Sequence, residues 1–191
     1  MIIRTDDIDG RKIFIVDKCL SDEEIKNFYT LVKGLSFTRT EKDHENDQYP
    51  IFSVDFIPDK VDGKTAVGLK SRELINRFYP DLDYRLYRSY INMTHYGDME
   101  YPHKDCSDEE NDLTIVYYVN EIWDYIWGGE TIFYSEKDPR VLVLPKPGRF
   151  VLFHGNIEHM GSIPTRECTT SRFSFALKYR LKGAVAQNLT A

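Results

Sequence analysis

The sequence contains few cysteines. Only three occur among 191 residues, Cys19, Cys106 and Cys168, and no C-x-x-C pair is present. An odd number of widely spaced cysteines argues against a disulfide framework and against a cysteine-rich zinc site. We therefore expect free thiols, a reducing compartment and a cytoplasmic location.

Long hydrophobic runs and an excess of positive charge are also missing. No apolar stretch approaches the roughly 18 residues that cross a membrane, and the first residues lack the basic and apolar regions of a signal peptide. The formal net charge is −6, whereas a protein that wraps duplex nucleic acid needs a basic surface. We expect neither a membrane nor a nucleic acid as partner. The oligomeric state stays open.

What the chain does contain is typical of one globular domain. It is 41% hydrophobic and 29% charged, and its 13 tyrosines and 11 phenylalanines favour strands. In the first 83 residues, apolar spacing and a Ser21-Asp-Glu-Glu24 capping box predict a helix over 21–33, and a second helix fits 65–79. Short strands are expected at 13–16 and 53–57, and the polar segment 39–50 reads as a loop.

After Asp83 the pattern changes to short strands. They are expected at 84–94, 113–120, 131–134, 141–144, 149–153 and 172–180. Turn signals such as Gly128-Gly129, Asp138-Pro139 and Pro147-Gly148 separate them. Many short strands with such turns indicate a β-sandwich or barrel, on whose outer face the two helices would pack.

Three side chains in the β-region could hold a metal. In an extended chain, His103 and Asp105 point to the same side. His159 follows after several strands that could return the chain across a barrel. Two imidazoles and one carboxylate on one face of a metal leave three positions open, the pattern of non-haem Fe(II) oxygenases. A lone H-x-D is a weak signal, and His159 could instead be an ordinary loop histidine.

Arg172 opens the last predicted strand. Alternation places Arg172, Ser174 and Ala176 on one face. A guanidinium with a nearby hydroxyl suits a carboxylate. The alternative is an arginine at a strand edge that pairs with a surface acid.

Taken together, the order of these motifs resembles the iron- and 2-oxoglutarate-dependent dioxygenases, in particular their prolyl-4-hydroxylase-like branch. The resemblance extends roughly from Arg88 to Tyr179 and is weaker before that. The residues that carry it are His103-x-Asp105, Thr114-Ile-Val-Tyr-Tyr-Val-Asn120, Trp123, Gly128-Gly129, Pro147-Gly-Arg-Phe-Val-Leu-Phe153, His159 and Arg172-Phe-Ser174.

The resemblance implies a mainly β fold with flanking helices. It would be a double-stranded β-helix, a jelly-roll or cupin-like barrel supported by N-terminal α-helices. We accordingly describe residues 1–191 as a single dioxygenase domain. Its parts would be the N-terminal helical support with edge strands (1–83), the jelly-roll core (84–182) and a tail (183–191).

The resemblance also implies the site. His103, Asp105 and His159 would be the ligands of Fe(II), and Arg172 would bind the distal carboxylate of 2-oxoglutarate with help from Tyr118 and Ser174. O₂ is the other co-substrate, and ascorbate is a candidate reductant. One position departs from the branch: its second tyrosine, on the strand before H-x-D, has no counterpart among Met93, Thr94 and His95, and Asn92 and His95 are weak substitutes.

The implied activity is hydroxylation of an aliphatic C–H with release of succinate and CO₂. We expect a small-molecule or peptide substrate, with a prolyl or other amino-acid unit favoured. Trp123, Tyr125 and Trp127 would either line a substrate lip or belong to the core. The alternatives are a hydroxylase of an unrelated small metabolite and a non-catalytic cupin-like binding barrel.

Overall fold

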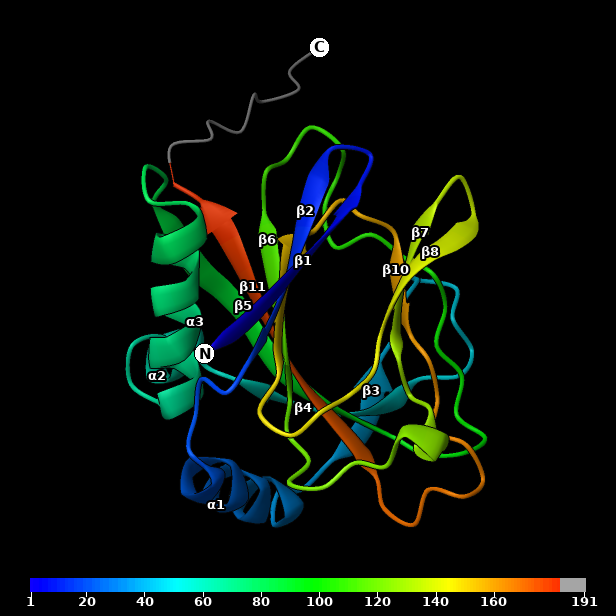
Figure 1. Cartoon of the computed structure of the whole chain (residues 1–191). Coiled ribbons are helices and arrows are strands. Elements are labelled where there is room, and N and C mark those ends of the chain that lie inside the picture. Colours follow the sequence, from blue (N-terminus) through cyan, green and yellow to red (C-terminus); the bar gives the residue numbers. More distant parts are fainter. Residues whose placement is uncertain (183–191) are drawn as a thin grey trace.

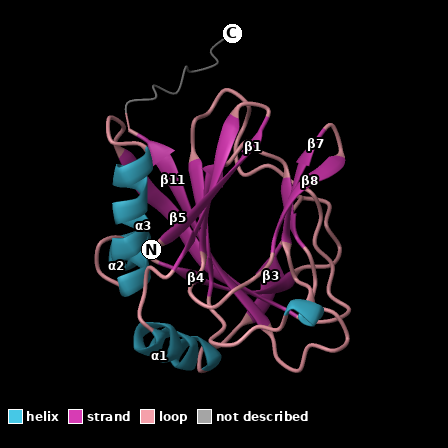
Figure 2. Cartoon of the chain, viewed as in Figure 1, coloured by secondary structure: helices cyan, strands magenta, loops and turns pink. Residues whose placement is uncertain are grey.

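Two antiparallel sheets that face each other form the body of the protein (Figure 1). The computed structural model describes residues 1–182. Its larger sheet has eight strands in the order β1-β2-β9-β6-β11-β5-β4-β3, and its smaller sheet has three in the order β10-β7-β8. The long helices lie on the side of the larger sheet that faces away from the smaller one (Figure 2). This arrangement confirms the predicted jelly roll with flanking helices.

The elements follow one another along the chain, and the long connection between β5 and β6 carries His103 and Asp105. Their bounds are β1 Ile2–Ile8, β2 Arg11–Asp17, α1 Asp22–Lys33, β3 Thr38–Glu41, β4 Ile51–Phe56, α2 Pro58–Val61, α3 Ala66–Phe78, β5 Tyr84–Thr94, β6 Leu113–Tyr118, a 3-10 turn Tyr125–Trp127, β7 Thr131–Ser135, β8 Asp138–Val143, β9 Phe150–His154, β10 His159–Gly161 and β11 Arg172–Leu181.

The N-terminal segment supplies both edges of the larger sheet. β1 and β2 form a hairpin at one edge, and β4 and β3 form the other. The sequence analysis did not predict β1. The signal for it is Asp9-Gly10, whose positive φ angles of 51° and 81° form a tight hairpin turn. The division of residues 1–191 into one domain stays a prediction, and the expected tail 183–191 lies outside the described residues.

Two predicted connections are wrong in part. Residues 39–41, the start of the loop expected at 39–50, belong to β3, a short charged strand of the kind that protects a sheet edge. Asp138-Pro139 belongs to β8, and the turn lies just before it at Glu136-Lys137, where both φ angles are positive. Proline is tolerated there because β8 is an edge strand.

The α1 helix begins with the predicted capping box. The Ser21 hydroxyl accepts from the backbone N–H of Glu24 at 3.3 Å, and the Glu24 carboxylate accepts from the backbone N–H of Ser21 at 2.8 Å. The backbone N–H groups of Ser21 and Glu24 at the helix start thereby both have an acceptor.

We expect Ser21→Ala to lower the free energy of unfolding by about 1 kcal/mol, because one capped N–H loses its acceptor. Urea denaturation followed by circular dichroism measures this change. Thr38→Ala, a truncation of an exposed hydroxyl outside any helix cap, is the matched control. A Ser21→Ala protein as stable as the wild type would show that the cap does not contribute to the free energy of unfolding.

Alternation along β11 separates two environments. Phe173, Phe175, Leu177 and Tyr179 belong to the apolar cluster that the helices cover. Arg172, Ser174, Ala176 and Lys178 therefore face the space between the two sheets. The inner face of the last strand thus carries two cations and a hydroxyl into the barrel.

Candidate active site

Three side chains from separate parts of the chain meet between the sheets. His103 and His159 exchange two backbone hydrogen bonds of 2.9 Å each, and the Asp105 N–H donates to the Gly155 carbonyl at 2.7 Å. One potential ligand atom from each of His103, Asp105 and His159 lies within 4.8 Å of the others. The Nε2 atoms of the two histidines lie 3.6 Å from different oxygens of Asp105.

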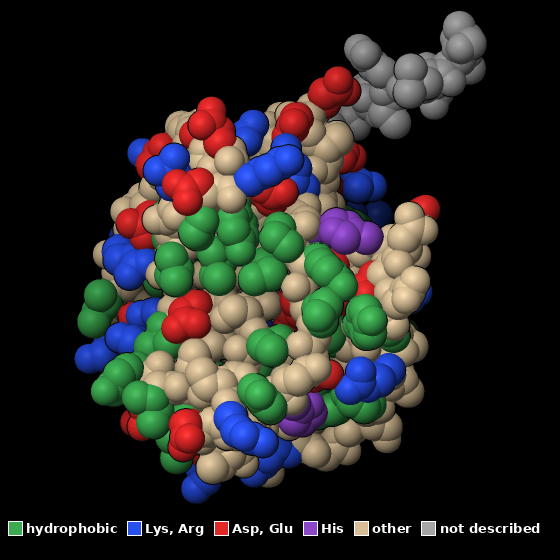
Figure 3. All heavy atoms as spheres, turned by 90° about the vertical axis from the view of Figure 1, so that its right-hand side faces the viewer, with side chains coloured by type: hydrophobic (Ala, Val, Ile, Leu, Met, Phe, Trp, Pro, Cys, Tyr) green, Lys and Arg blue, Asp and Glu red, His purple; other side chains and the backbone are tan. Residues whose placement is uncertain are grey.

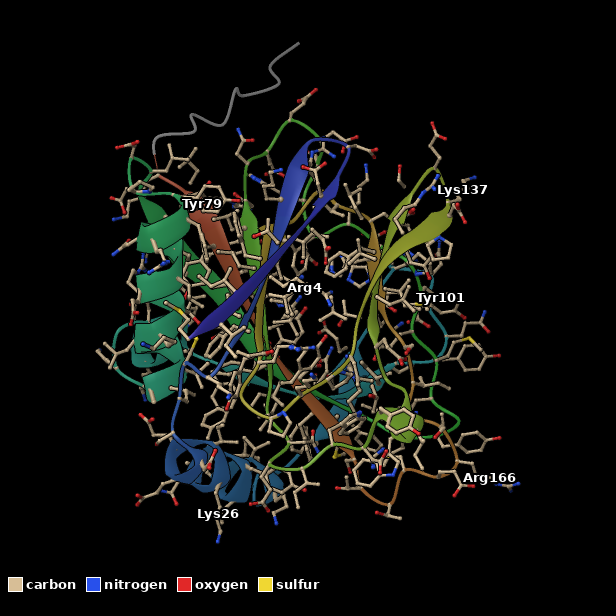
Figure 4. The ribbon with its side chains drawn as sticks, in the orientation of Figure 1. Arg4, Lys26, Tyr79, Tyr101, Lys137 and Arg166 are labelled. Carbon is tan, nitrogen blue, oxygen red and sulfur yellow. The ribbon has the colours of Figure 1, made fainter. Side chains whose placement is uncertain are left out.

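Backbone carbonyls orient both imidazole rings. Nδ1 of His103 lies 2.9 Å from the carbonyl of Tyr101, and Nδ1 of His159 lies 2.9 Å from that of Ile157. Tyr101 lies on the side of the barrel formed by the smaller sheet (Figure 4). A ring that donates through Nδ1 directs the lone pair of Nε2 towards the cluster, which is the tautomer that a metal ligand needs.

The titration of the three groups reflects their burial and mutual charge. Burial opposes protonation of His103, but the hydrogen bond and charge of Asp105 raise its pKa to about 9. Burial lowers the pKa of His159 to about 4. Burial alone would raise the pKa of Asp105, but the surrounding positive charge holds it well below its usual value. A metal ion bound here would therefore displace a proton from His103.

Asp105 has two further partners. Nζ of Lys178 lies 2.7 Å from Oδ1 of Asp105, and the Thr114 hydroxyl donates to Oδ2 at 2.5 Å. The Lys178 side chain is 10% exposed and the Asp105 side chain 3% exposed. Nζ of Lys178 also lies 5.3 Å from the centre of the Tyr90 ring. The buried carboxylate is thus paired with a lysine that is itself largely buried.

Replacing Lys178 with methionine should destabilise the metal-free protein by about 1.5–3 kcal/mol, because Asp105 loses a charged hydrogen-bond donor but keeps the protonated His103 beside it. Urea denaturation in the presence of a chelator measures the change. Lys182→Met is the matched control, because the exposed Lys182–Asp83 pair should contribute at most about 1 kcal/mol. Equal stability of the two variants would mean that the ion pair between Lys178 and Asp105 does not contribute to the free energy of unfolding.

Arg172 opens into the same cavity as the three clustered side chains. Its side chain is almost fully buried. Nε donates to the Gly129 carbonyl at 2.7 Å, and Nη1 donates to the Ser174 hydroxyl at 3.3 Å. Asn92 lines the cavity from β5 and has a buried Oδ1 without a hydrogen-bond partner among the described residues. The cavity can therefore bind an anion beside Arg172, and the Oδ1 atom of Asn92 is left to accept a further hydrogen bond.

Tyr118 lies behind this cavity rather than along its wall. Its hydroxyl donates to Thr131 Oγ1 at 2.7 Å and approaches the Val143 carbonyl at 3.1 Å, while the Arg172 guanidinium lies 5.7 Å from its ring centre. Thr131 does line the cavity. A direct contact between Tyr118 and 2-oxoglutarate stays a prediction, and the observed contacts make Tyr118 a support for Arg172 and Thr131.

The aromatic segment after β6 supports the site from outside. Trp123 donates to the Gly128 carbonyl at 3.0 Å and packs edge-on against Trp127. A Cβ on Gly129 would lie 3.0 Å from Arg172 Cδ and 3.1 Å from Trp123, so only glycine fits easily between them. Trp123, Tyr125 and Trp127 do not line the cavity that the described residues form.

The remaining histidines lie away from the cluster. Nε2 of His154 bonds the Tyr79 hydroxyl at 3.1 Å, and Nε2 of His95 bonds the Ser171 hydroxyl at 2.7 Å. His44 belongs to a separate surface hollow beside Tyr49. A larger cavity of about 410 Å³ lies near the far ends of β5 and β11, and it contains none of the clustered residues.

Several residues at the site escaped the sequence analysis. Tyr90 and Thr114 line the cavity, and Lys178 bonds Asp105. All three are on inner strand faces, and alternation extended from Arg172 or Asn92 would have found Lys178 and Tyr90. Three acids also line the cavity, namely Glu41, Asp43 and Glu100. Nothing local in the sequence connects these acids with His103 or His159, because they belong to β3 and to irregular segments.

The donor set fits iron and 2-oxoglutarate. Two neutral imidazoles and one carboxylate are the facial set that holds Fe(II) and leaves positions free. The buried guanidinium of Arg172, with the Ser174 hydroxyl beside it, suits a carboxylate at the inner end of the cavity.

The chain matches a family model over residues 91–180, that of the 2OG-Fe(II) oxygenase superfamily. The matched segment includes His103, Asp105, His159 and Arg172. No curated protein matches the sequence.

Solved structures share the fold at low sequence identity. A viral collagen prolyl hydroxylase from Paramecium Bursaria Chlorella virus-1 is 21% identical, with a TM-score of 0.63 over 91% of this chain and 92% of that one. A prolyl hydroxylase from Trichoplax adhaerens, in complex with a hypoxia inducible factor peptide fragment, is 18% identical, with a TM-score of 0.65 over 88% and 83%. A non-heme alpha ketoglutarate dependent epimerase from nogalamycin biosynthesis is 14% identical, with a TM-score of 0.65 over 88% and 78%.

The family model and the shared jelly-roll fold confirm the resemblance found in the sequence. The protein carries a 2OG-Fe(II) oxygenase domain match over residues 91–180 and has the fold of prolyl hydroxylases, and it is a 2-oxoglutarate-dependent dioxygenase.

Proposed function

We propose that this dioxygenase hydroxylates an aliphatic C–H bond of a prolyl or other amino-acid unit. The observation that carries the proposal is the shared cavity of His103, Asp105, His159 and Arg172. It brings a metal-ligand set and a carboxylate-binding arginine to the wall of one cavity.

In this proposal each side chain has a stated role. His103, Asp105 and His159 hold Fe(II), and Arg172 with Ser174 holds the distal carboxylate of 2-oxoglutarate, with Tyr118 behind them. When bound, iron and 2-oxoglutarate supply the oxidising power that transfers oxygen from O₂ to a C–H bond. The protein orients both ligands and keeps bulk water from the inner end of the cavity, where Arg172 is buried.

Fe(II), 2-oxoglutarate and O₂ are the requirements of the superfamily. Ascorbate is proposed in addition, as a reductant that returns iron to the ferrous state. Omission of each component from a succinate assay tests these requirements separately.

The amino-acid substrate is favoured by the fold. Two of the similar structures are prolyl hydroxylases, and one of them holds a peptide. The alternative, an unrelated small metabolite, is kept because an epimerase of a biosynthetic pathway has the same fold. The third possibility, a non-catalytic barrel, is disfavoured by the family match and by the intact cluster.

A small molecule or a peptide is the proposed partner. Seen from the side of the smaller sheet, basic side chains are scattered among acidic and apolar ones (Figure 3). That face therefore offers no continuous basic surface for a nucleic acid. Among residues 1–182, no helix is long and apolar enough to cross a membrane. The three free cysteines agree with the proposed cytoplasmic location.

The test is the coupling of succinate release to substrate oxidation. Purified protein with Fe(II), 2-oxoglutarate and ascorbate should release succinate slowly, and faster with a proline-containing peptide or free proline, which should gain the mass of one oxygen atom. If only an unrelated metabolite stimulates turnover, the amino-acid proposal fails and the dioxygenase assignment stands.

A further inference from the structure

Glu100 places a carboxylate in the active-site cavity, and it forms no salt bridge within residues 1–182. It lines the cavity with His103 and Arg172, and its Oε1 atom is buried. Among the described residues this oxygen has no hydrogen-bond partner. The carboxylate has the backbone N–H of Gly161 as a hydrogen-bond neighbour but no salt bridge among the described residues. A buried carboxylate without a cation beside it is unfavourable, so this position calls for a positive group.

Gly161 provides the space that this carboxylate occupies. A Cβ built on Gly161 would lie 2.4 Å from Oε2 of Glu100, closer than atoms can approach. The φ angle of Gly161 is not in the left-handed region, so the backbone does not require glycine there. Gly161 lies two residues after His159 on β10. The missing side chain therefore admits Glu100 to the rim of the metal-ligand cluster.

The other acids of the cavity have partners. The following pairs occur: Asp105 with Lys178 at 2.7 Å, Glu41 with Arg88 at 2.6 Å, and Asp43 with Nδ1 of His103 at 3.3 Å. Arg172 bonds Gly129 and Ser174 and is assigned to 2-oxoglutarate under the proposed function. Glu100 is the acid that these pairs leave without a cation.

The titration of Glu100 agrees with this geometry. Burial raises its pKa to about 7, because the charge of Arg172 offsets only part of the desolvation and Asp43 adds to it. A cation bound beside the carboxylate would favour its charged form again. The cavity thus has a place for one positively charged group of a ligand.

We propose that Glu100 binds the substrate, and that the cavity selects a substrate with a protonated nitrogen close to the carbon that is hydroxylated. This inference rests on the proposed function and narrows it. A free amino acid, including proline with its secondary ammonium, or a basic side chain meets the requirement. A prolyl residue within a peptide does not, because its nitrogen is an uncharged amide.

Binding of candidate substrates to a form of the protein that cannot turn over tests this proposal. The wild type is loaded with Mn(II) and N-oxalylglycine, and ligands are titrated by calorimetry in matched pairs. The pairs are proline with N-acetylproline, Nα-acetyl-lysine amide with Nα-acetyl-norleucine amide, and Nα-acetyl-arginine amide with Nα-acetyl-citrulline amide. In at least one pair, the cationic member should bind about tenfold or more tighter than its neutral partner.

Two variants should remove this preference. Glu100→Gln keeps the shape but not the charge, and Gly161→Ala displaces the carboxylate. In each, the ratio within the pair should fall below about threefold. Glu23→Gln, the same change on the exposed start of α1, should keep the wild-type ratio. Mn(II) and N-oxalylglycine affinities, measured in each variant, show whether loading is equal.

The inference is overturned if no cationic ligand binds, if neutral partners bind equally well, or if both Glu100→Gln and Gly161→Ala keep the preference. Its failure can be told apart from failure of the proposed function. Slow succinate release by the wild type without substrate reports the dioxygenase activity alone and does not depend on the choice of ligand.

Discussion

Replacing His159 with alanine should abolish succinate formation and weaken metal binding by at least about a hundredfold, while the protein still folds. The loss of metal affinity exceeds the loss caused by removing a group that only hydrogen-bonds to a ligand, because here a ligand itself is removed. In the described part of the chain, Asp105 is the one charged partner of His159, and the apolar clusters are built from other residues. Calorimetric titration with Mn(II) and a succinate assay measure the two effects. His103→Ala should behave in the same way.

Asp105→Ala should lose metal binding and also lose stability. Without Asp105, Lys178 is left as a buried charge, which costs about 3–5 kcal/mol. Its thermal denaturation should therefore occur well below that of the two histidine variants. The double variant Asp105→Ala, Lys178→Met should recover part of the loss.

His44→Ala and His154→Ala are the controls, since both side chains lie outside the cavity of the cluster. They should keep metal binding and turnover. Near-normal succinate formation in any of the three cluster variants would disprove the proposed ligand assignment.

Arg172→Met should raise the concentration of 2-oxoglutarate needed for half-maximal turnover by a hundredfold to a few thousandfold, on the order of 3–5 kcal/mol. The guanidinium is buried, so its loss leaves a carboxylate in a dry cavity without its partner. Arg172→Lys should be intermediate, because lysine keeps the charge but not the two-pronged geometry. Direct titration of Mn(II)-loaded protein with 2-oxoglutarate separates binding from turnover.

Arg180→Met on the same strand is the matched control, because Arg180 is 55% exposed, bonds Asp112 and does not line the cavity. Its 2-oxoglutarate affinity should equal that of the wild type. An unchanged affinity in Arg172→Met would transfer the role to Lys178. Arg149 is a poor substitute, because its guanidinium is bonded to Asp17 and to the Leu144 carbonyl.

Periodicity in the sequence determined which side chains share a face. The period of two along β11 placed Arg172 and Ser174 on one face and Phe173 and Phe175 on the other, and the structure turns the second face towards the helices. The capping box fixed the start of α1. The H-x-D, His and Arg motifs, in their order, indicated the fold and the class of chemistry. These features depend on neighbours in the chain, so local sequence is sufficient for them.

The tertiary structure alone decided what meets across the barrel. Lys178 and Asp105 lie 73 positions apart, and the carboxylate of Glu100 reaches Gly161 from an irregular segment. The hydroxyl of Tyr118 turned out to bond Thr131 and Val143. Alternation specifies a face, whereas a contact between strands depends on sheet order and register, which the packing of the whole core sets. The charge balance of the site, and with it the proposed choice of substrate, is therefore a property of the folded barrel.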